Sequence, residues 1–229
     1  MAVSRGEAMT RRFQAVVVAL AVALPCLSPP IGAATVSGTV SIAGRGGSEE
    51  PAGVVWLEGV PGGAPEPGRA VIDMRKKAFR PGVVAVPVGS SVSFPNADPI
   101  LHNVFSVSER NQFDLGLYGQ GDGRTVVFRE PGVVRVYCNV HPQMEAFVVV
   151  TPGPWWSSVA ADGSFRIDGA PPGTYQIRVW DRQGGLESRP VEVTGHGLVR
   201  VDFSLDASGY RKRPHLDKDG RPYTSRERY

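Results

Sequence analysis

The chain has 229 residues, with 28 glycines, 20 prolines and a formal net charge of +3. This length is enough for one large domain or two small β domains. Glycine and proline follow no three-residue period, which excludes a collagen-like protein. A hydrophobic content of 41% is too high for a disordered chain and too low for a membrane protein with many spans. The small net charge argues against a protein that binds nucleic acid by neutralising phosphates.

Residues 1–34 have the pattern of a secretory signal peptide. Arg11 and Arg12 precede an apolar run at 13–24, and small residues close the segment. The uninterrupted part of this run is ten residues long, whereas a bilayer span needs roughly 20. We therefore expect cleavage after Ala34, no membrane span in the mature chain, and a periplasmic or otherwise exported protein. An uncleaved anchor and twin-arginine export are the alternatives.

Cleavage would leave a single cysteine in an oxidising compartment. It removes Cys26, three arginines and one glutamate, so the mature chain keeps Cys138, 22 basic and 21 acidic residues. A disulfide within the mature chain is then impossible. A lone exported thiol is expected to be buried or bound to a ligand.

The mature chain is predicted to be all-β. Short valine-rich runs alternate with glycine and proline turns, and no helical periodicity follows residue 34, a pattern typical of β-sandwiches. Residues 207–229 are largely charged and almost free of apolar side chains, and are predicted to be a mobile tail. His215 in this tail, like His196, is predicted to lie on the surface. The expected strands are 36–42, 54–57, 70–74, 83–88, 91–94, 104–107, 125–128, 133–137, 146–150, 164–167, 175–180, 191–194 and 199–205.

The residues that carry chemistry gather after one predicted strand. Cys138, His141 and Met144 follow it at intervals of three, and His102 lies 36 residues before the cysteine. Two imidazoles, one thiolate and a weak axial thioether form the ligand set of a blue-copper electron-transfer site. A lone cysteine is most often a small buried hydrophobe. A site of one cysteine and two histidines also suits zinc, but methionine is a poor zinc ligand, so the set favours one type 1 copper.

Residues from about 70 to 151 resemble the cupredoxin family. The motifs are Phe-Pro-Asn-x-Asp at 94–98, His-Asn-Val-Phe-Ser at 102–106 and Cys-x-x-His-Pro-x-Met at 138–144. The short ligand loop is similar to that of amicyanin. The whole mature chain, with Phe-Asp-Leu-Gly-x-Tyr at 113–118, is similar to plastocyanin-like proteins labelled methylamine utilization proteins.

The resemblance implies a role for each of these residues. His102, Cys138 and His141 would be the equatorial copper ligands, and Met144 the axial one. Asn103 would tie the ligand loop to the neighbouring strand, as groups around a metal site orient its ligands. No residue links the chain to amine oxidation.

A second module is divided in the sequence. Residues 36–57 resemble the opening of a carboxypeptidase regulatory-like, transthyretin-type sandwich. The usual continuation of that sandwich, Asp-Gly-x-Phe and then Pro-Pro-Gly-x-Tyr, occurs here only at 162–165 and 171–175. The cupredoxin motifs lie between these pieces.

We therefore expect a discontinuous β-sandwich, residues 35–66 with 153–206, into which a Greek-key cupredoxin sandwich, residues 67–152, is inserted. The alternative is two strands added to the cupredoxin sheet and followed by an independent small domain. Trp155 and Trp156 are expected to pack between the two modules.

These features favour a periplasmic carrier of single electrons that is not an enzyme. Four histidines are too few for the additional sites of a multicopper oxidase. The expected partners are a c-type cytochrome or a periplasmic amine or alcohol dehydrogenase. Two other classes stay open. A copper-binding protein for trafficking, storage or sensing would favour sulfur ligands open to solvent. A structural or carbohydrate-contact module would use Trp155 and Trp156 as its aromatic platform.

Overall fold

The computed structural model describes residues 32–45, 53–63, 65–212 and 214–223. Within these ranges the chain is all-β, as predicted, with a single 3-10 turn, η1 (Glu109–Asn111). No helix among the described residues has the length and apolar character to cross a bilayer. The predicted signal peptide falls almost entirely outside the described residues.

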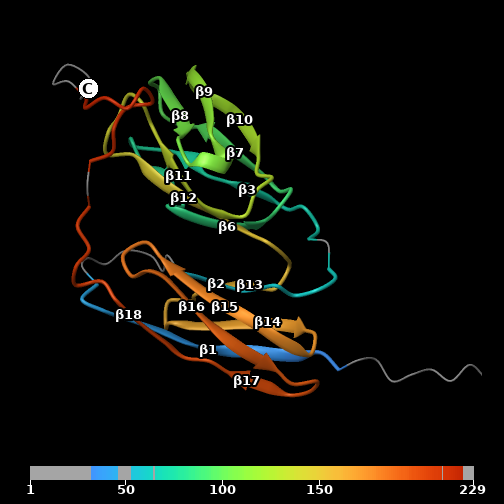
Figure 1. The fold of residues 1–229 in the computed structure, drawn as a ribbon. Helices are drawn as coiled ribbons and strands as arrows, with labels where there is room; N and C mark the ends of the chain where they lie inside the picture. The colour runs from blue at the N-terminus through green and yellow to red at the C-terminus, as the bar shows by residue number, and fades with distance from the viewer. Residues whose placement is uncertain (1–31, 46–52, 64, 213, 224–229) are drawn as a thin grey trace, which may run out of the picture. The chain divides into compact units, whose positions relative to one another are not determined.

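The first and last strands form one sandwich, here called the flanking sandwich. In Figure 1, β1 lies beside strands that come more than a hundred residues later, and β2 does the same in the facing sheet. Side chains from both sheets form one buried core, which includes Val36, Leu57 and Ile177. One sheet has the order β14 (Ser164–Ala170), β1 (Ala34–Ala43), β17 (Leu198–Arg200), with β18 (Phe203–Asp206) also paired to β1, and the other has the order β13 (Trp156–Ser158), β2 (Val54–Glu58), β15 (Gly173–Asp181), β16 (Gly185–Val193).

The intervening strands form a second sandwich, here called the central sandwich. Its two sheets enclose a separate core that includes Phe94, Val104, Val136 and Cys138. One sheet has the order β10 (Gly121–Val127), β7 (Ser91–Asn96), β4 (Asp73–Met74), β5 (Phe79–Arg80), with β3 (Arg69–Val71) also paired to β7. The other has the order β6 (Val83–Pro87), β12 (Glu145–Thr151), β11 (Gly132–Tyr137), β8 (His102–Ser106), β9 (Phe113–Tyr118).

Strand β12 is apolar on both faces because it borders two cores. Its sequence Glu-Ala-Phe-Val-Val-Val-Thr is buried from the second residue onward, as expected of a strand covered on both sides. Val148 and Val150 belong to the central core, whereas Phe147 and Val149 pack in a third cluster with side chains of the flanking sandwich. The Trp180 ring lies 5.0 Å from that of Phe147, measured between centroids.

Only one of the two adjacent tryptophans packs between the sandwiches. Trp156 packs against the third cluster, between the sandwiches, as predicted. Trp155 packs instead against the core of the flanking sandwich, and its indole Nε1–H donates to the Gly169 carbonyl at 3.0 Å.

Three strands were not expected from the sequence: β5, β9 and β13. Two of them have only two or three residues, too short for an alternation of apolar and polar side chains to be visible. Strand β9 contains Gly116 at a φ of 67°, which interrupts its regular alternation. The expected strand at 70–74 is divided into β3 and β4, which pair with different parts of β7.

Candidate metal centre

A tight hairpin presents the ligand loop. Strands β11 and β12 pair antiparallel up to Tyr137 opposite Glu145, so the loop 138–144 closes directly on the ladder. Within it, the Met144 N–H donates to the His141 carbonyl at 3.0 Å, and the Cys138 N–H faces the Met144 carbonyl at 3.4 Å. The backbone of the loop is therefore fixed by its own hydrogen bonds.

Three donor atoms converge at this end of the central sandwich. Cys138 Sγ lies 3.8 Å from His102 Nδ1 and 3.7 Å from His141 Nδ1, and the two ring nitrogens are 3.1 Å apart. All three residues are buried. With metal–nitrogen bonds of about 2.0 Å and metal–sulfur bonds of about 2.3 Å, ligand atoms of one ion stand roughly 3.3–3.8 Å apart. The cluster therefore has the dimensions of a metal site, and its one sulfur and two imidazole nitrogens fit copper.

The orientation of His102 is set by a carboxylate. Its Nε2 lies 2.9 Å from Asp98 Oδ2. An ionised carboxylate only accepts hydrogen bonds, so the neutral imidazole carries its proton on Nε2. The Nδ1 lone pair is then free to face Cys138 and His141, which is the arrangement that a metal ligand requires.

Asp98 is itself held by a turn of the backbone. Lys76 and Lys77 both have positive φ, 54° and 55°, and their N–H groups donate to the two carboxylate oxygens at 2.6 and 2.9 Å. Burial alone would raise the pKa of Asp98, but these two bonds and the one with His102 outweigh it and hold the pKa below its ordinary value. Sequence reasoning did not identify Asp98 as part of the site. Its place four residues before His102 was the available signal.

Cys138 is a free, buried thiol among the described residues. Burial raises its pKa, and the backbone N–H groups of Asn103, Val140 and His141 offset this rise only in part. Hydrogen bonds of this kind favour the thiolate, which is the form that binds metal.

Asn103 links three elements around the loop. Its Oδ1 accepts from the Asn139 N–H at 3.2 Å, and its Nδ2 donates to Asp114 Oδ1 at 2.7 Å. Asn103 lies on β8, Asp114 on β9 and Asn139 in the ligand loop. The first of these bonds joins the loop to β8.

Met144 ends the loop as a buried side chain of the central core, 1% exposed and in the same cluster as Cys138. Its role as the axial ligand stays a prediction.

Of the two histidines predicted to lie on the surface, only His196 is exposed. His215 is half-buried, and its ring stacks on Tyr137 with centroids 4.0 Å apart. The described part of the predicted mobile tail lies against the central sandwich, because its aromatic and hydrogen-bonding groups find partners there. This contact differs from the expectation of a detached tail.

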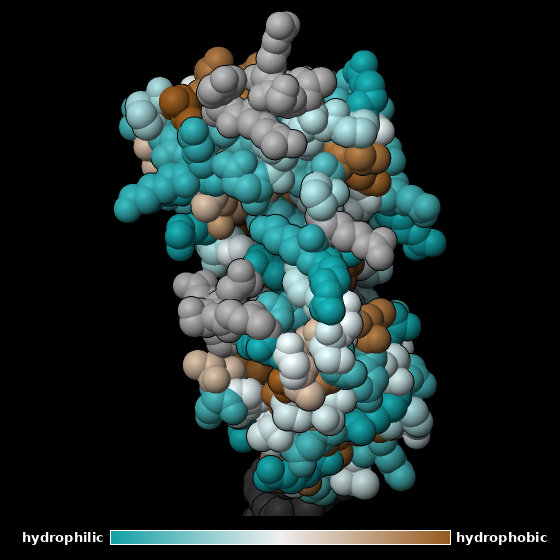
Figure 2. Space-filling view, turned by 90° about the vertical axis from the view of Figure 1, so that its left-hand side faces the viewer, coloured by the Kyte–Doolittle hydropathy of each residue, from teal (hydrophilic) through white to brown (hydrophobic). Residues whose placement is uncertain are grey.

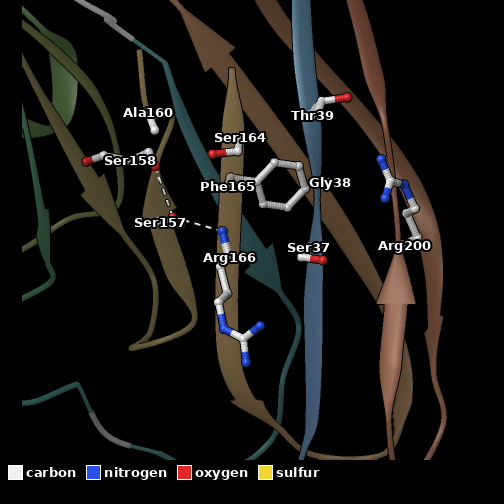
Figure 3. A pocket seen from close by; sticks show the side chains of 10 residues that line it. All are labelled: Ser37, Gly38, Thr39, Ser157, Ser158, Ala160, Ser164, Phe165, Arg166 and Arg200. Carbon is white, nitrogen blue, oxygen red and sulfur yellow. Dashed lines mark hydrogen bonds between the residues drawn. The ribbon is translucent and has the colours of Figure 1, made fainter. Parts of the chain in front are cut away.

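A hollow of about 480 Å³ on the flanking sandwich has a different chemistry (Figure 3). Serine and threonine hydroxyls line it with Arg166 and Arg200, which pair with Asp168 and Asp202. Neither Trp155 nor Trp156 is among its lining residues. Its aromatic lining residue is Phe165, which is only 4% exposed, so the hollow lacks the tryptophan platform expected of a carbohydrate-contact module.

Comparison with solved structures finds cupredoxins. A purple cupredoxin from Nitrosopumilus maritimus is 28% identical, over a match that covers 36% of this chain and 99% of that chain, with a TM-score of 0.33. A variant of amicyanin in its reduced state is 25% identical, with coverages of 42% and 98% and a TM-score of 0.34. The copper-containing nitrite reductase of Thermus scotoductus is 25% identical, with coverages of 43% and 26% and a TM-score of 0.36. No family model matches the chain, and no curated protein matches it. These three solved structures, two cupredoxins and a copper-containing nitrite reductase, are each matched over less than half of this chain.

Proposed function

We propose that this chain is an exported type 1 copper protein that transfers single electrons between redox partners. The observation that carries the proposal is the convergence of His102 Nδ1, Cys138 Sγ and His141 Nδ1 within 4.8 Å of one another. Met144 would complete the set as a weak axial ligand. A bound copper ion would supply reversible one-electron chemistry, and a site that suits both oxidation states needs little rearrangement when the electron moves.

The burial of the cluster supports a carrier over a trafficking, storage or sensing protein. His102 and Cys138 are fully buried and His141 is 3% exposed. A protein that hands copper onward needs ligands that a recipient can reach, whereas a carrier needs ligands that stay in place. The hydrogen-bonded loop and the Asp98–His102 pair favour retention.

The expected partners are a c-type cytochrome or a periplasmic dehydrogenase. Electrons would leave by the edge of His141, beside Pro142 and the exposed Gln143. The proposed periplasmic location depends on the signal-peptide pattern of residues 1–34. The methylamine utilization label rests on the sequence resemblance alone.

We also propose that the flanking sandwich is a carboxypeptidase regulatory-like unit, residues 35–66 with 153–206, interrupted by a cupredoxin domain, residues 67–152. The strand order supports this division, because every strand paired with β1 or β2 comes from 156 onward. Residues 207–229, predicted to be a mobile tail, would then follow the flanking sandwich in the chain.

The decisive experiment is the visible spectrum of the mature protein with Cu(II). A thiolate-to-copper absorption should make the protein intensely coloured, and Cys138→Ser should abolish the colour. His196→Gln, an exposed histidine far from the loop in sequence, is the control and should leave the spectrum unchanged. A colourless protein that holds zinc more tightly than copper would refute the proposal.

An electron carrier and a copper-trafficking protein differ in how fast they exchange electrons and how fast they release copper. A carrier should be oxidised and reduced rapidly by a small c-type cytochrome while a competing Cu(I) chelator removes little copper on the same timescale. Release of copper within seconds, together with sluggish electron exchange, would assign the protein to copper trafficking instead.

A further inference from the structure

The C-terminal part of the described chain lies beside the metal centre. Residues 215–223, here called the strap, run past the end of the central sandwich near β8 (Figure 1) and carry two aromatic side chains, His215 and Tyr223. The His215 ring stacks on Tyr137 with an interplanar angle of 22° and lies 6.2 Å from the Phe105 ring. Tyr223 meets the His215 ring edge-on at 5.2 Å. The strap therefore covers the residue that immediately precedes Cys138.

Two hydrogen bonds from the strap reach the first two residues of the ligand loop. Tyr223 Oη donates to the Cys138 carbonyl at 3.0 Å. The Lys218 N–H donates to Asn139 Oδ1 at 2.8 Å. Because Cys138 is the proposed sulfur ligand, the Tyr223 bond acts on the backbone that sets the position of the sulfur.

A closed ring of polar contacts adds a second attachment. Lys218 Nζ lies 2.8 Å from Asp114 Oδ2, while the other oxygen of Asp114 accepts from Asn103 Nδ2 at 2.7 Å. Asn103 in turn accepts from the Asn139 N–H, and Asn139 accepts from the Lys218 N–H. Asn103 directly follows His102 in the chain, so the ring links the strap, through Asp114 and Asn139, to a neighbour of each of two proposed ligands.

The strap also approaches the later part of the ligand loop, since the His215 side chain interacts with the Pro142 backbone. A cavity of about 560 Å³ lies beside this contact, lined by Pro142 and Gln143 of the loop and by Glu145 of β12. The side of the molecule seen in Figure 2 is mostly hydrophilic, with separate hydrophobic spots. The two hydrogen bonds described above attach the strap to the cysteine end of the loop.

We propose that the strap is a positioning element of the metal centre, in which Tyr223 and Lys218 fix the backbone around Cys138 and so determine how firmly the metal is held. This inference rests on the proposed copper site. Groups that orient metal ligands typically change metal affinity by 10- to 100-fold when they are removed. Tyr223 acts one step further out, through the Cys138 backbone, so we expect an effect near the lower limit, about tenfold.

The test compares two tyrosines that make the same bond in different places. Tyr223→Phe removes the bond to the Cys138 carbonyl. Tyr175→Phe is the matched control, since its hydroxyl donates to the Pro172 carbonyl at 2.9 Å in the flanking sandwich. Tyr223→Phe should release copper about tenfold faster and shift the visible spectrum and the reduction potential, whereas Tyr175→Phe should match the wild-type chain.

Amide hydrogen exchange of the metal-free protein separates this inference from the proposed function. Tyr223→Phe should accelerate exchange at Asn139, whose N–H is held by Asn103, and Tyr175→Phe should not. Because this measurement uses the metal-free protein, it tests the strap independently of whether the site binds copper. Unchanged exchange at Asn139 would refute the positioning role, and so would faster exchange with unchanged copper release.

A second pair of variants covers the case in which Tyr223→Phe does not fold. Lys218→Met removes the charged contact with Asp114 and should also loosen Asn139 and speed copper release. Lys218→Arg keeps a cation at this position and should restore both. Equal copper release by the Met and Arg variants would show that the Asp114 contact does not position the loop, and would overturn the role given to Lys218.

Discussion

Replacing Asp98 by asparagine removes a charge beside the candidate metal centre while every proposed metal ligand is kept. In the structure, Oδ2 accepts from both His102 Nε2 and the Lys77 N–H, and Oδ1 accepts from the Lys76 N–H. Asparagine has nearly the same shape but only one acceptor oxygen. Its NH₂ group would face at least one of these donors, so the variant cannot satisfy all three.

The size of the effect follows from these contacts. Loss of the carboxylate that orients a metal-binding histidine should weaken copper binding by about 10- to 100-fold, or about 1.4–2.8 kcal/mol. The donor left without an acceptor should cost the metal-free protein about 1–3 kcal/mol of unfolding free energy. Removal of a nearby negative charge favours the less positive ion, so the reduction potential should rise.

Three measurements check this prediction. Competition with a chelator gives the Cu(II) affinity, voltammetry gives the potential, and denaturant unfolding gives the stability of the metal-free protein. Asp162→Asn is the control, because Asp162 accepts from the Ser164 N–H and Oγ on the flanking sandwich. If Asp98→Asn binds Cu(II) within twofold of the wild-type chain, Asp98 does not orient His102 in the way described here.

Two further predictions concern Met144 and Asp114. Met144→Leu should leave the copper-loaded protein folded and coloured but raise its potential, because a weak donor to oxidised copper is lost; an unchanged spectrum and potential, measured by absorption and voltammetry, would show that Met144 is not a ligand. For Asp114, burial raises the pKa, but hydrogen bonds from Lys218, Gly116 and Asn103 outweigh it and lower the pKa of the folded state. Its stabilising contribution is therefore present above the unfolded-state pKa, about 3.9, and is lost as the pH falls through the lower folded-state value. In denaturant unfolding, Asp114→Asn should be less stable than the wild-type chain at pH 7, and this difference should shrink as the pH falls below about 3.9; a difference that stays constant there would contradict the assignment.

The sequence predicted most strands of both cores, although not β5, β9 and β13, and it predicted the three residues of the cluster. Runs such as Val133–Tyr137 and Ala146–Val150 are apolar enough to show their burial directly. Cys138 and His141 lie three residues apart after a strand, so their proximity is a local property. His102 lies 36 positions away, so it could be grouped with them only through the chemistry of a blue-copper ligand set and the cupredoxin resemblance.

The supporting groups could not be predicted in the same way. Asp98 reaches His102 because two lysines with positive φ fix its carboxylate, and backbone conformations of this kind leave no pattern of apolar residues. The strap is polar and carries as many acidic as basic side chains, so its composition is that of a mobile segment. Its attachment depends on single rings and N–H groups that meet Tyr137, Cys138 and Asn139 only in the folded chain.

The position of β1 and β2 in the chain has a consequence for biosynthesis. In the described structure both strands pair only with strands from 156 onward, so neither has a sheet partner until most of the chain is made. The strands of the central sandwich all lie between 69 and 151, so they can pair with one another before the last strands are made. Contacts so distant in sequence form slowly, and unpaired strand edges are prone to aggregation during that time. A chain that stops after the central sandwich would keep the metal ligands but leave β1 and β2 as exposed, apolar edges, so the newly made protein depends on its last strands for solubility.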